Sequence, residues 1–163
     1  MAQSSDFSDI AGLDDLIHFV DRYCLEFMVP DCKFDATMQL ALDLDHQAIM
    51  KLSSDEANAY AFRLHAYVIF LRKELDKILA KKLWCEEILH KVVGRNWGNF
   101  SEYMRYEPKR QAIIEEDTFA SKAEKMRVQL TAAALQSEEK IKSVAKMADI
   151  LENLAKKKAF SER

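Results

Sequence analysis

Glycine and proline are scarce in this chain of 163 residues, which contains three Gly and two Pro. Strands joined by tight turns depend on these two residues, so their scarcity argues against a turn-rich β fold. Hydrophobic residues make up 49% of the sequence, which is enough for a packed core and excludes wholesale disorder. The composition therefore predicts an all-α protein with few connections.

Long apolar runs and paired cysteines are also missing. The longest uncharged run in the most hydrophobic region, residues 66–71, is far shorter than the roughly 20 residues of a membrane-spanning helix. The polar, acidic N-terminus MAQSSDFSD has neither the basic nor the apolar segment of a secretory signal. Cys24, Cys32 and Cys85 lack the spacing of paired metal ligands, so we expect free thiols. These absences predict a cytoplasmic protein without membrane contact.

Charge is divided unevenly along the chain, although the formal net charge is only −3. Residues 1–62 contain three Lys/Arg against 12 Asp/Glu, a balance of −9, and residues 63–163 contain the remaining 21 against 15, a balance of +6. A basic body of this kind can meet a polyanion, while the acidic part meets a protein or shields the body. Ordinary solvated helix faces are the alternative interpretation.

Apolar spacing predicts two short helices in the acidic part of the chain. The first covers about residues 13–28, and the second covers the sequence ATMQLALDL, residues 36–44. Together they form an acidic N-terminal helical segment, residues 1–52. A basic body of long helices, residues 53–163, follows it within what we expect to be one domain overall.

The clearest predicted helix begins with a capping box of Ser53 and Glu56 and ends at Gly94 as its C-cap. Its apolar positions follow the 4,3 spacing of a coiled-coil seam, in which Lys82 is the single charged member. The seam consists of Ala57, Ala61, Leu64, Val68, Leu71, Leu75, Ile78, Lys82, Cys85, Leu89 and Val92. Such a helix needs a partner, and the spacing leaves open whether the partner belongs to the same chain or to another copy.

A second long helix is predicted from about Pro108, which suits a first turn, to about Lys158, with a kink near Asp117. It has a seam of its own, made by Phe119, Ala123, Met126, Leu130, Ala134, Ser137, Ile141, Val144, Ala148, Leu151 and Ala155. A 4,4 step at Leu130 is a stutter that locally unwinds a supercoil. The two seams predict a partly coiled-coil helical bundle that self-associates as a homo-oligomer.

The stretch RNWGNFSEYMRYEPKR, residues 95–110, places an aromatic at every third position among basic side chains. Single-stranded nucleic acid is bound by such a combination, because bases stack on aromatic faces and cations hold the phosphates. The same spacing also buries one face of a helix at a corner. We expect the aromatic face to point largely inward, with Trp97 and Tyr103 as exceptions, and the basic face outward. The candidate nucleic-acid-binding residues are Lys91, Arg95, Trp97, Tyr103, Arg105, Lys109 and Arg110.

Signals for catalysis are poor. Carboxylate-x-x-His patterns occur at Asp15/His18, Asp43/His46 and Glu87/His90. Carboxylate metal bundles, however, need inward-facing Glu from four helices. No phosphate-binding loop, nucleophile elbow or zinc-protease motif is present in the sequence. We therefore predict no enzyme activity, no cofactor and no metal site.

The body of the chain resembles the UvsY-type recombination mediators of T-even-like phages. The resemblance extends from SSDEANAY to ADILENL, through ILHKVVGR and FSEYMRYEPKRQAIIEED. It implies a helical protein that oligomerises through its C-terminal helices, binds single-stranded DNA, and helps a RecA-like recombinase displace the single-strand-binding protein. The basic positions of the family near the end of the long helix fall on Lys91 and Arg95. The acidic segment 1–52 is longer than the family pattern requires.

The predicted function is that of a mediator of DNA recombination and repair, acting in the host cytoplasm if the chain is phage-encoded. Basic residues hold the phosphates, and oligomerisation multiplies weak contacts. The basic tail, Lys156 to Lys158, is a second place for phosphate contacts, although cations there also complement a helix C-terminus. The alternative is a helical adaptor or inhibitor that binds only proteins.

Overall fold

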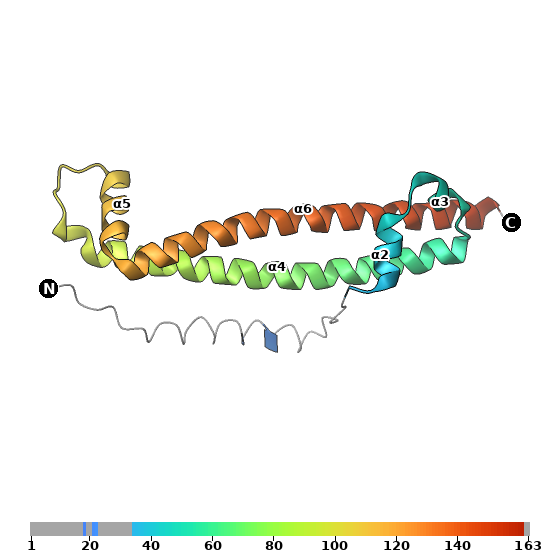
Figure 1. Ribbon diagram of the computed structural model, residues 1–163, viewed down its shortest axis with the longest axis horizontal. Coiled ribbons are helices and arrows are strands. Elements are labelled where there is room, and N and C mark those ends of the chain that lie inside the picture. Colours follow the sequence, from blue (N-terminus) through green and yellow to red (C-terminus); the bar gives the residue numbers. More distant parts are fainter. Residues whose placement is uncertain (1–17, 19–20, 23–33, 162–163) are drawn as a thin grey trace. The chain divides into compact units, whose positions relative to one another are not determined.

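The computed structural model describes residue 18, residues 21–22 and residues 34–161 (Figure 1). Over this part of the chain every regular element is a helix, which confirms the predicted all-α class. The elements are α2 (Ala36–Asp43), α3 (His46–Lys51), α4 (Ser54–Asn96), the 3₁₀ helix η2 (Trp97–Asn99), α5 (Tyr106–Glu116) and α6 (Thr118–Ser161). The helix predicted over residues 13–28 lies outside the described residues, apart from three helical positions. None of the described helices is long and apolar enough to cross a membrane.

The described residues divide into two compact units. The terminal unit contains residues 34–75 and 136–161, and the corner unit contains residues 76–135 together with the described positions before residue 23. Both long helices contribute to both units. The division therefore crosses α4 and α6, whereas the sequence suggested a division after residue 52.

Aspartate side chains cap the N-termini of the two short helices of the terminal unit. Asp35 is the N-cap of α2 and accepts a hydrogen bond from the Met38 amide at 2.8 Å, and Asp45 does the same for the Ala48 amide of α3 at 2.7 Å. An N-cap carboxylate satisfies an amide that has no partner within the helix. The predicted helix over residues 36–44 is confirmed as α2.

Helix α4 begins as predicted and ends two residues later than predicted. The Ser53 amide donates to Glu56 Oε2 at 2.8 Å and the Glu56 amide donates to Ser53 Oγ at 3.2 Å, which is the expected capping box. The hydrogen bond from the Ser53 backbone is the main cause that lowers the pKa of Glu56. The prediction of Gly94 as C-cap was wrong, because the helix continues through it to Asn96. Asn96 Nδ2 donates to the Val92 carbonyl at 3.0 Å and satisfies an acceptor of the last turn.

The core of the terminal unit is built from the seams of α4 and α6. Ser54 Oγ donates to the Ala155 carbonyl at 3.0 Å, so the start of α4 lies beside the end of α6. Leu64 and Leu151 are fully buried. The cluster is completed by α2 and consists of Met38, Ala41, Ala61, Leu64, Tyr67, Val68, Ile141, Val144, Ala148 and Leu151. In this unit the two seams are therefore partners within one chain.

The core of the corner unit joins the later part of α4 to α5 and the beginning of α6. It consists of Ile88, Leu89, Val92, Val93, Ile113, Ile114, Ala120 and Ala123. The rings of Trp84 and Phe119 pack edge to face against this cluster with centroids 6.4 Å apart. The Cys85 thiol is free and buried, and burial raises its pKa. Lys82 is half-buried, with Nζ 3.8 Å from Glu86 Oε1.

The predicted kink near Asp117 is a complete break between α5 and α6. Asp117 Oδ1 accepts hydrogen bonds from the amides of Phe119 and Ala120, both at 2.9 Å. The side chain thus caps the new helix at the residue where the old one ends. Pro108 lies in the first turn of α5 as predicted, where its missing N–H costs no helical hydrogen bond.

Candidate nucleic-acid interface

The connection between α4 and α5 holds most of the predicted nucleic-acid-binding residues. After α4 the chain makes the single turn of η2 and then continues to residue 105 without a further helix (Figure 1). Ser101 organises this segment: its carbonyl accepts from the Met104 amide at 3.2 Å and its Oγ accepts from the Tyr103 amide at 3.3 Å. The local turn fixes the backbone and leaves residues 101–108 exposed.

Lys109 lies inside the corner and not on its surface. Only 3% of this residue is exposed. Its Nζ donates to the Phe100 carbonyl at 3.2 Å and lies 4.4 Å from the centroid of the Trp97 ring. An ammonium in this position is attracted by the negative face of the ring. The prediction that Lys109 contacts phosphate does not fit this burial, and the side chain instead ties α5 to the end of α4.

Trp97 is also part of the packing. It is half-buried against the core of the corner unit, and its ring centroid lies 5.3 Å from that of Tyr106. With Lys109 and Tyr106 both against the indole, little of its face is left for a base. Trp97 was expected to be an exception to the inward-pointing aromatics, and it lies between the two cases, half-buried against the core.

Five side chains remain available on the outside of the corner. Tyr103 is 98% exposed and Tyr106 is 60% exposed. Lys91, Arg95 and Arg105 are exposed, and the first two are one helical turn apart on α4. Lys91 Nζ lies 3.5 Å from Glu87 Oε1, but an exposed pair of this kind is weak and easily exchanged for another anion. We call Lys91, Arg95, Tyr103, Arg105 and Tyr106 the corner surface.

Arg110, the last of the predicted residues, takes part in an ion-pair network on the border of this surface. Its guanidinium lies 3.8 Å from Glu124 Oε2, while Arg127 makes two hydrogen bonds of 2.8 Å with the same carboxylate. The hydrogen bonds from Arg127 are the main cause that lowers the pKa of Glu124, with the charges of Arg127 and Arg110 acting in the same direction. Glu124 is thus hydrogen-bonded to Arg127, whereas Arg110 makes only the longer ion pair with it.

A shallow hollow of about 280 Å³ lies between α4, α5 and α6 in the corner unit. Its lining combines apolar and charged side chains: Glu86, Leu89, His90, Val93, Tyr106, Arg110 and Arg127. One wall is the exposed Tyr106 ring, so the hollow is continuous with the corner surface. Arg110, the more loosely paired of its two arginines, gives the hollow positive charge next to Tyr106.

The basic tail offers less free charge than its sequence suggests. Lys158 Nζ donates to the Met50 carbonyl at 2.9 Å and to the Leu52 carbonyl. Lys156 Nζ donates to Glu152 Oε1 at 2.5 Å. Both lysines therefore have partners within the terminal unit. The corner surface is the stronger candidate for binding a polyanion.

Comparison with known proteins identifies no relative, so the functional assignment depends on the residues of this chain. Neither a scan against protein-family models nor searches of curated proteins and of solved structures find a match. The resemblance to UvsY-type mediators therefore stays a prediction. The resemblance also implies that Lys91 and Arg95 are the basic groups at the end of the long helix. Both side chains are exposed.

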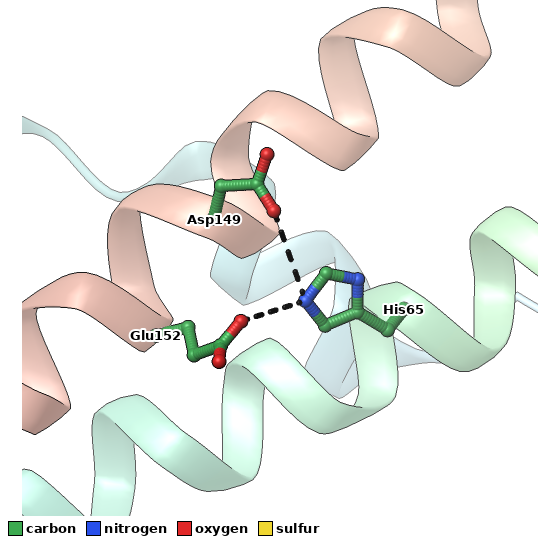
Figure 2. A group of neighbouring side chains, drawn as sticks. All are labelled: His65, Asp149 and Glu152. Carbon is green, nitrogen blue, oxygen red and sulfur yellow. Dashed lines mark ion pairs between the residues drawn. The ribbon is translucent and has the colours of Figure 1, made fainter.

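Two groups of residues were missed by the sequence analysis. The first is Glu124 and Arg127, whose i, i+3 spacing on a helix is a signal for an ion pair. The second is His65 with Asp149 and Glu152 in the terminal unit, whose ligand atoms lie within 4.8 Å of one another (Figure 2). The carboxylate-x-x-His patterns of the sequence gave no hint of this second group, because its histidine and carboxylates are on different helices.

Proposed function

We propose that this protein binds single-stranded DNA through the corner surface and acts as a recombination mediator. The observation that carries the proposal is the almost complete exposure of Tyr103, two residues from the exposed Arg105 and in the same corner as Arg95. A large aromatic ring has no packing reason to stand in water. Beside guanidinium groups it provides the stacking face and the phosphate contact that a single strand needs.

A single strand fits this surface better than a duplex. Unpaired bases offer their faces to Tyr103 and Tyr106, whereas the faces of paired bases are covered by their neighbours in the stack. The hollow beside Tyr106 is also lined by Arg110, which supplies positive charge next to the exposed tyrosine. Contacts of these two kinds bind bases with little preference for sequence, which suits a mediator that acts on any exposed strand.

The role of mediator rests on the resemblance to the UvsY family. In this proposal the chain holds a single strand while a RecA-like recombinase replaces the single-strand-binding protein. Self-association multiplies the weak contacts of each corner. In the terminal unit the seams of α4 and α6 contact each other within one chain. Exposed apolar side chains such as Leu135, Phe160 and Leu83 are the places left for contacts with other chains.

Fluorescence anisotropy with a labelled single strand and its matching duplex tests the binding step. We expect the wild-type chain to prefer the single strand and to bind it more weakly as salt rises from about 50 to about 200 mM. In Arg95→Ala with Arg105→Ala, the slope of log affinity against log salt should fall by about 0.7 for each lost phosphate contact. Lys142→Ala with Lys146→Ala removes the same charge from exposed positions of the terminal unit and is the matched control.

The outcomes separate the candidate functions. If the corner variant binds like the control variant, the DNA site lies elsewhere, and the Lys156 to Lys158 tail becomes the next candidate. Failure of the wild type to bind at low salt would favour the protein-binding adaptor. Phe62, which is 74% exposed, and Ile69, one heptad later on α4, would then be the residues to test against partner proteins. The mediator step itself is measured as faster replacement of single-strand-binding protein by a RecA-like recombinase.

A further inference from the structure

We propose that His65, Asp149 and Glu152 bind one Zn²⁺ ion between α4 and α6 in the terminal unit. This site is independent of the corner surface, because all three residues belong to the other compact unit. Among the described residues, this is the one group of three histidine, cysteine or carboxylate side chains that is close enough to share a metal ion. Figure 2 shows the imidazole directed from α4 toward the two carboxylates of α6.

Buried neighbours on α4 and α6 fix the positions of the three residues. His65 follows Leu64, and Asp149 and Glu152 follow Ala148 and Leu151, all of which are buried in the core of the terminal unit. Asp149 and Glu152 are three residues apart, so they project from the same side of α6. Because the neighbouring core residues fix the register of the two helices, only side-chain rotations separate the observed arrangement from a coordinated one.

The distances are close to those that a zinc ion requires. His65 Nε2 lies 3.5 Å from Glu152 Oε2 and 4.0 Å from Asp149 Oδ1. With Zn–N and Zn–O bonds of about 2.0–2.2 Å, two ligand atoms at a tetrahedral angle lie roughly 3.3–3.6 Å apart. The Glu152 contact already has this separation. A rotation of the exposed Asp149 side chain brings in the third ligand.

The surroundings favour a cation over a simple ion pair. Two carboxylate oxygens lie 3.5 and 4.0 Å from one imidazole nitrogen, and the Asp149 oxygen at 4.0 Å is beyond hydrogen-bond distance from it. A dication between them would neutralise both carboxylates. Lys156 holds Glu152 by its other oxygen, Oε1, at 2.5 Å. A partner of this kind orients a metal-binding carboxylate and leaves Oε2 directed toward the site.

The ligand set selects the metal. Imidazole nitrogen suits zinc and other late transition metals, whereas Mg²⁺ and Ca²⁺ prefer oxygen ligands alone. Three protein ligands on a partly exposed surface leave a fourth position for water, as in zinc sites with an open position. A bound ion would connect α4 to α6 across the surface of the terminal unit. Zinc should therefore stabilise this unit against unfolding.

Calorimetric titration of the EDTA-treated protein with ZnCl₂ tests the site. Cys24→Ser with Cys32→Ser serves as background, so that these thiols do not contribute to zinc binding. In this background we expect one equivalent of zinc to bind and the melting temperature to rise. Loss of an outer-shell partner alone weakens metal sites about 10–100-fold, so His65→Ala and Glu152→Gln should weaken binding at least tenfold. His46→Ala and Glu139→Gln, at exposed positions of the same unit, are the matched controls.

A Co²⁺ spectrum gives a second, independent readout. A visible absorption band from cobalt held by nitrogen and oxygen ligands should appear in the background protein and disappear in His65→Asn, which keeps a polar side chain of similar size. Circular dichroism confirms that each variant is folded. Equal zinc affinity in the background protein and the His65 variants, or no zinc binding up to millimolar concentration, would overturn the proposal and leave the three residues as an ordinary ion-pair cluster.

Discussion

The ammonium of Lys109 lies 4.4 Å from the centroid of the Trp97 ring, inside the corner that connects α4 to α5. This pair joins two residues that the sequence assigned to DNA binding, and in it Lys109 is buried and Trp97 is half-buried. The candidate binding residues that are exposed are therefore those of the corner surface. The pair also makes the stability of the corner separable from its binding function, because different residues serve the two.

Replacement of Lys109 by alanine should lower the free energy of unfolding by about 2–5 kcal/mol. The estimate combines the loss of a desolvated cation–π contact, about 0.5–2 kcal/mol, with that of a charged hydrogen bond to the Phe100 carbonyl, about 1.5–3 kcal/mol. Urea unfolding measures the change, and Lys122→Ala on the exposed side of α6 is the control. Normal stability together with weakened DNA binding would return Lys109 to the binding surface.

Alanine substitution at Tyr103 should affect DNA binding, whereas alanine substitution at Trp97 should affect stability. Tyr103→Ala should weaken binding of a single strand by about 1–3 kcal/mol and leave stability unchanged, because the exposed ring packs against little of the protein. Trp97→Ala should instead reduce stability toward the loss of about 3–5 kcal/mol that is typical of buried aromatics. Denaturation and anisotropy on the same samples give both quantities. Equal DNA affinity for wild type and Tyr103→Ala would contradict the corner surface.

Stability should depend on pH through Glu124. Its folded-state pKa is lowered, chiefly by the hydrogen bonds from Arg127, so its contribution to stability is fully present above the unfolded pKa. As pH falls through the lowered folded pKa, protonation removes this contribution. The stability difference between wild type and Glu124→Gln should therefore be largest near neutral pH and vanish in acid. Urea unfolding between about pH 7 and about pH 3 checks this, with Glu116→Gln as a surface control. A difference that is the same at every pH would rule out the ion pair as its source.

Lys82→Leu should raise the melting temperature modestly. The seam position is half-buried, so leucine adds apolar contact there, while the lost pair with Glu86 at 3.8 Å is worth little. Differential scanning calorimetry measures the shift, and Lys81→Leu at the neighbouring position tests whether any added leucine has the same effect. A lower melting temperature for Lys82→Leu would mean that the ammonium stabilises the fold. Light scattering on the same variant reports any change in oligomeric state.

Local signals predicted the helices well, because they act over a few residues. The Ser53/Glu56 capping box, Pro108 in a first turn and the interruption at Asp117 all depend on hydrogen bonds or steric contacts within about one helical turn. Gly94 misled the analysis for the complementary reason. A glycine permits a helix end but does not force one, and α4 continues past Gly94 to Asn96, whose side chain donates to the Val92 carbonyl.

The sequence by itself determined that this protein is helical, where the first of its long helices begins, and which positions of the long helices are apolar. Only the tertiary structure decided what those positions pack against. A heptad seam has the same spacing whether its partner is in another chain or the same one, and here α4 and α6 of one chain bury each other. The surroundings of Lys109 and His65 likewise depend on residues that are close in space. Lys109 is buried against a carbonyl and a ring at the corner, and His65 lies beside carboxylates about 85 residues away in the sequence.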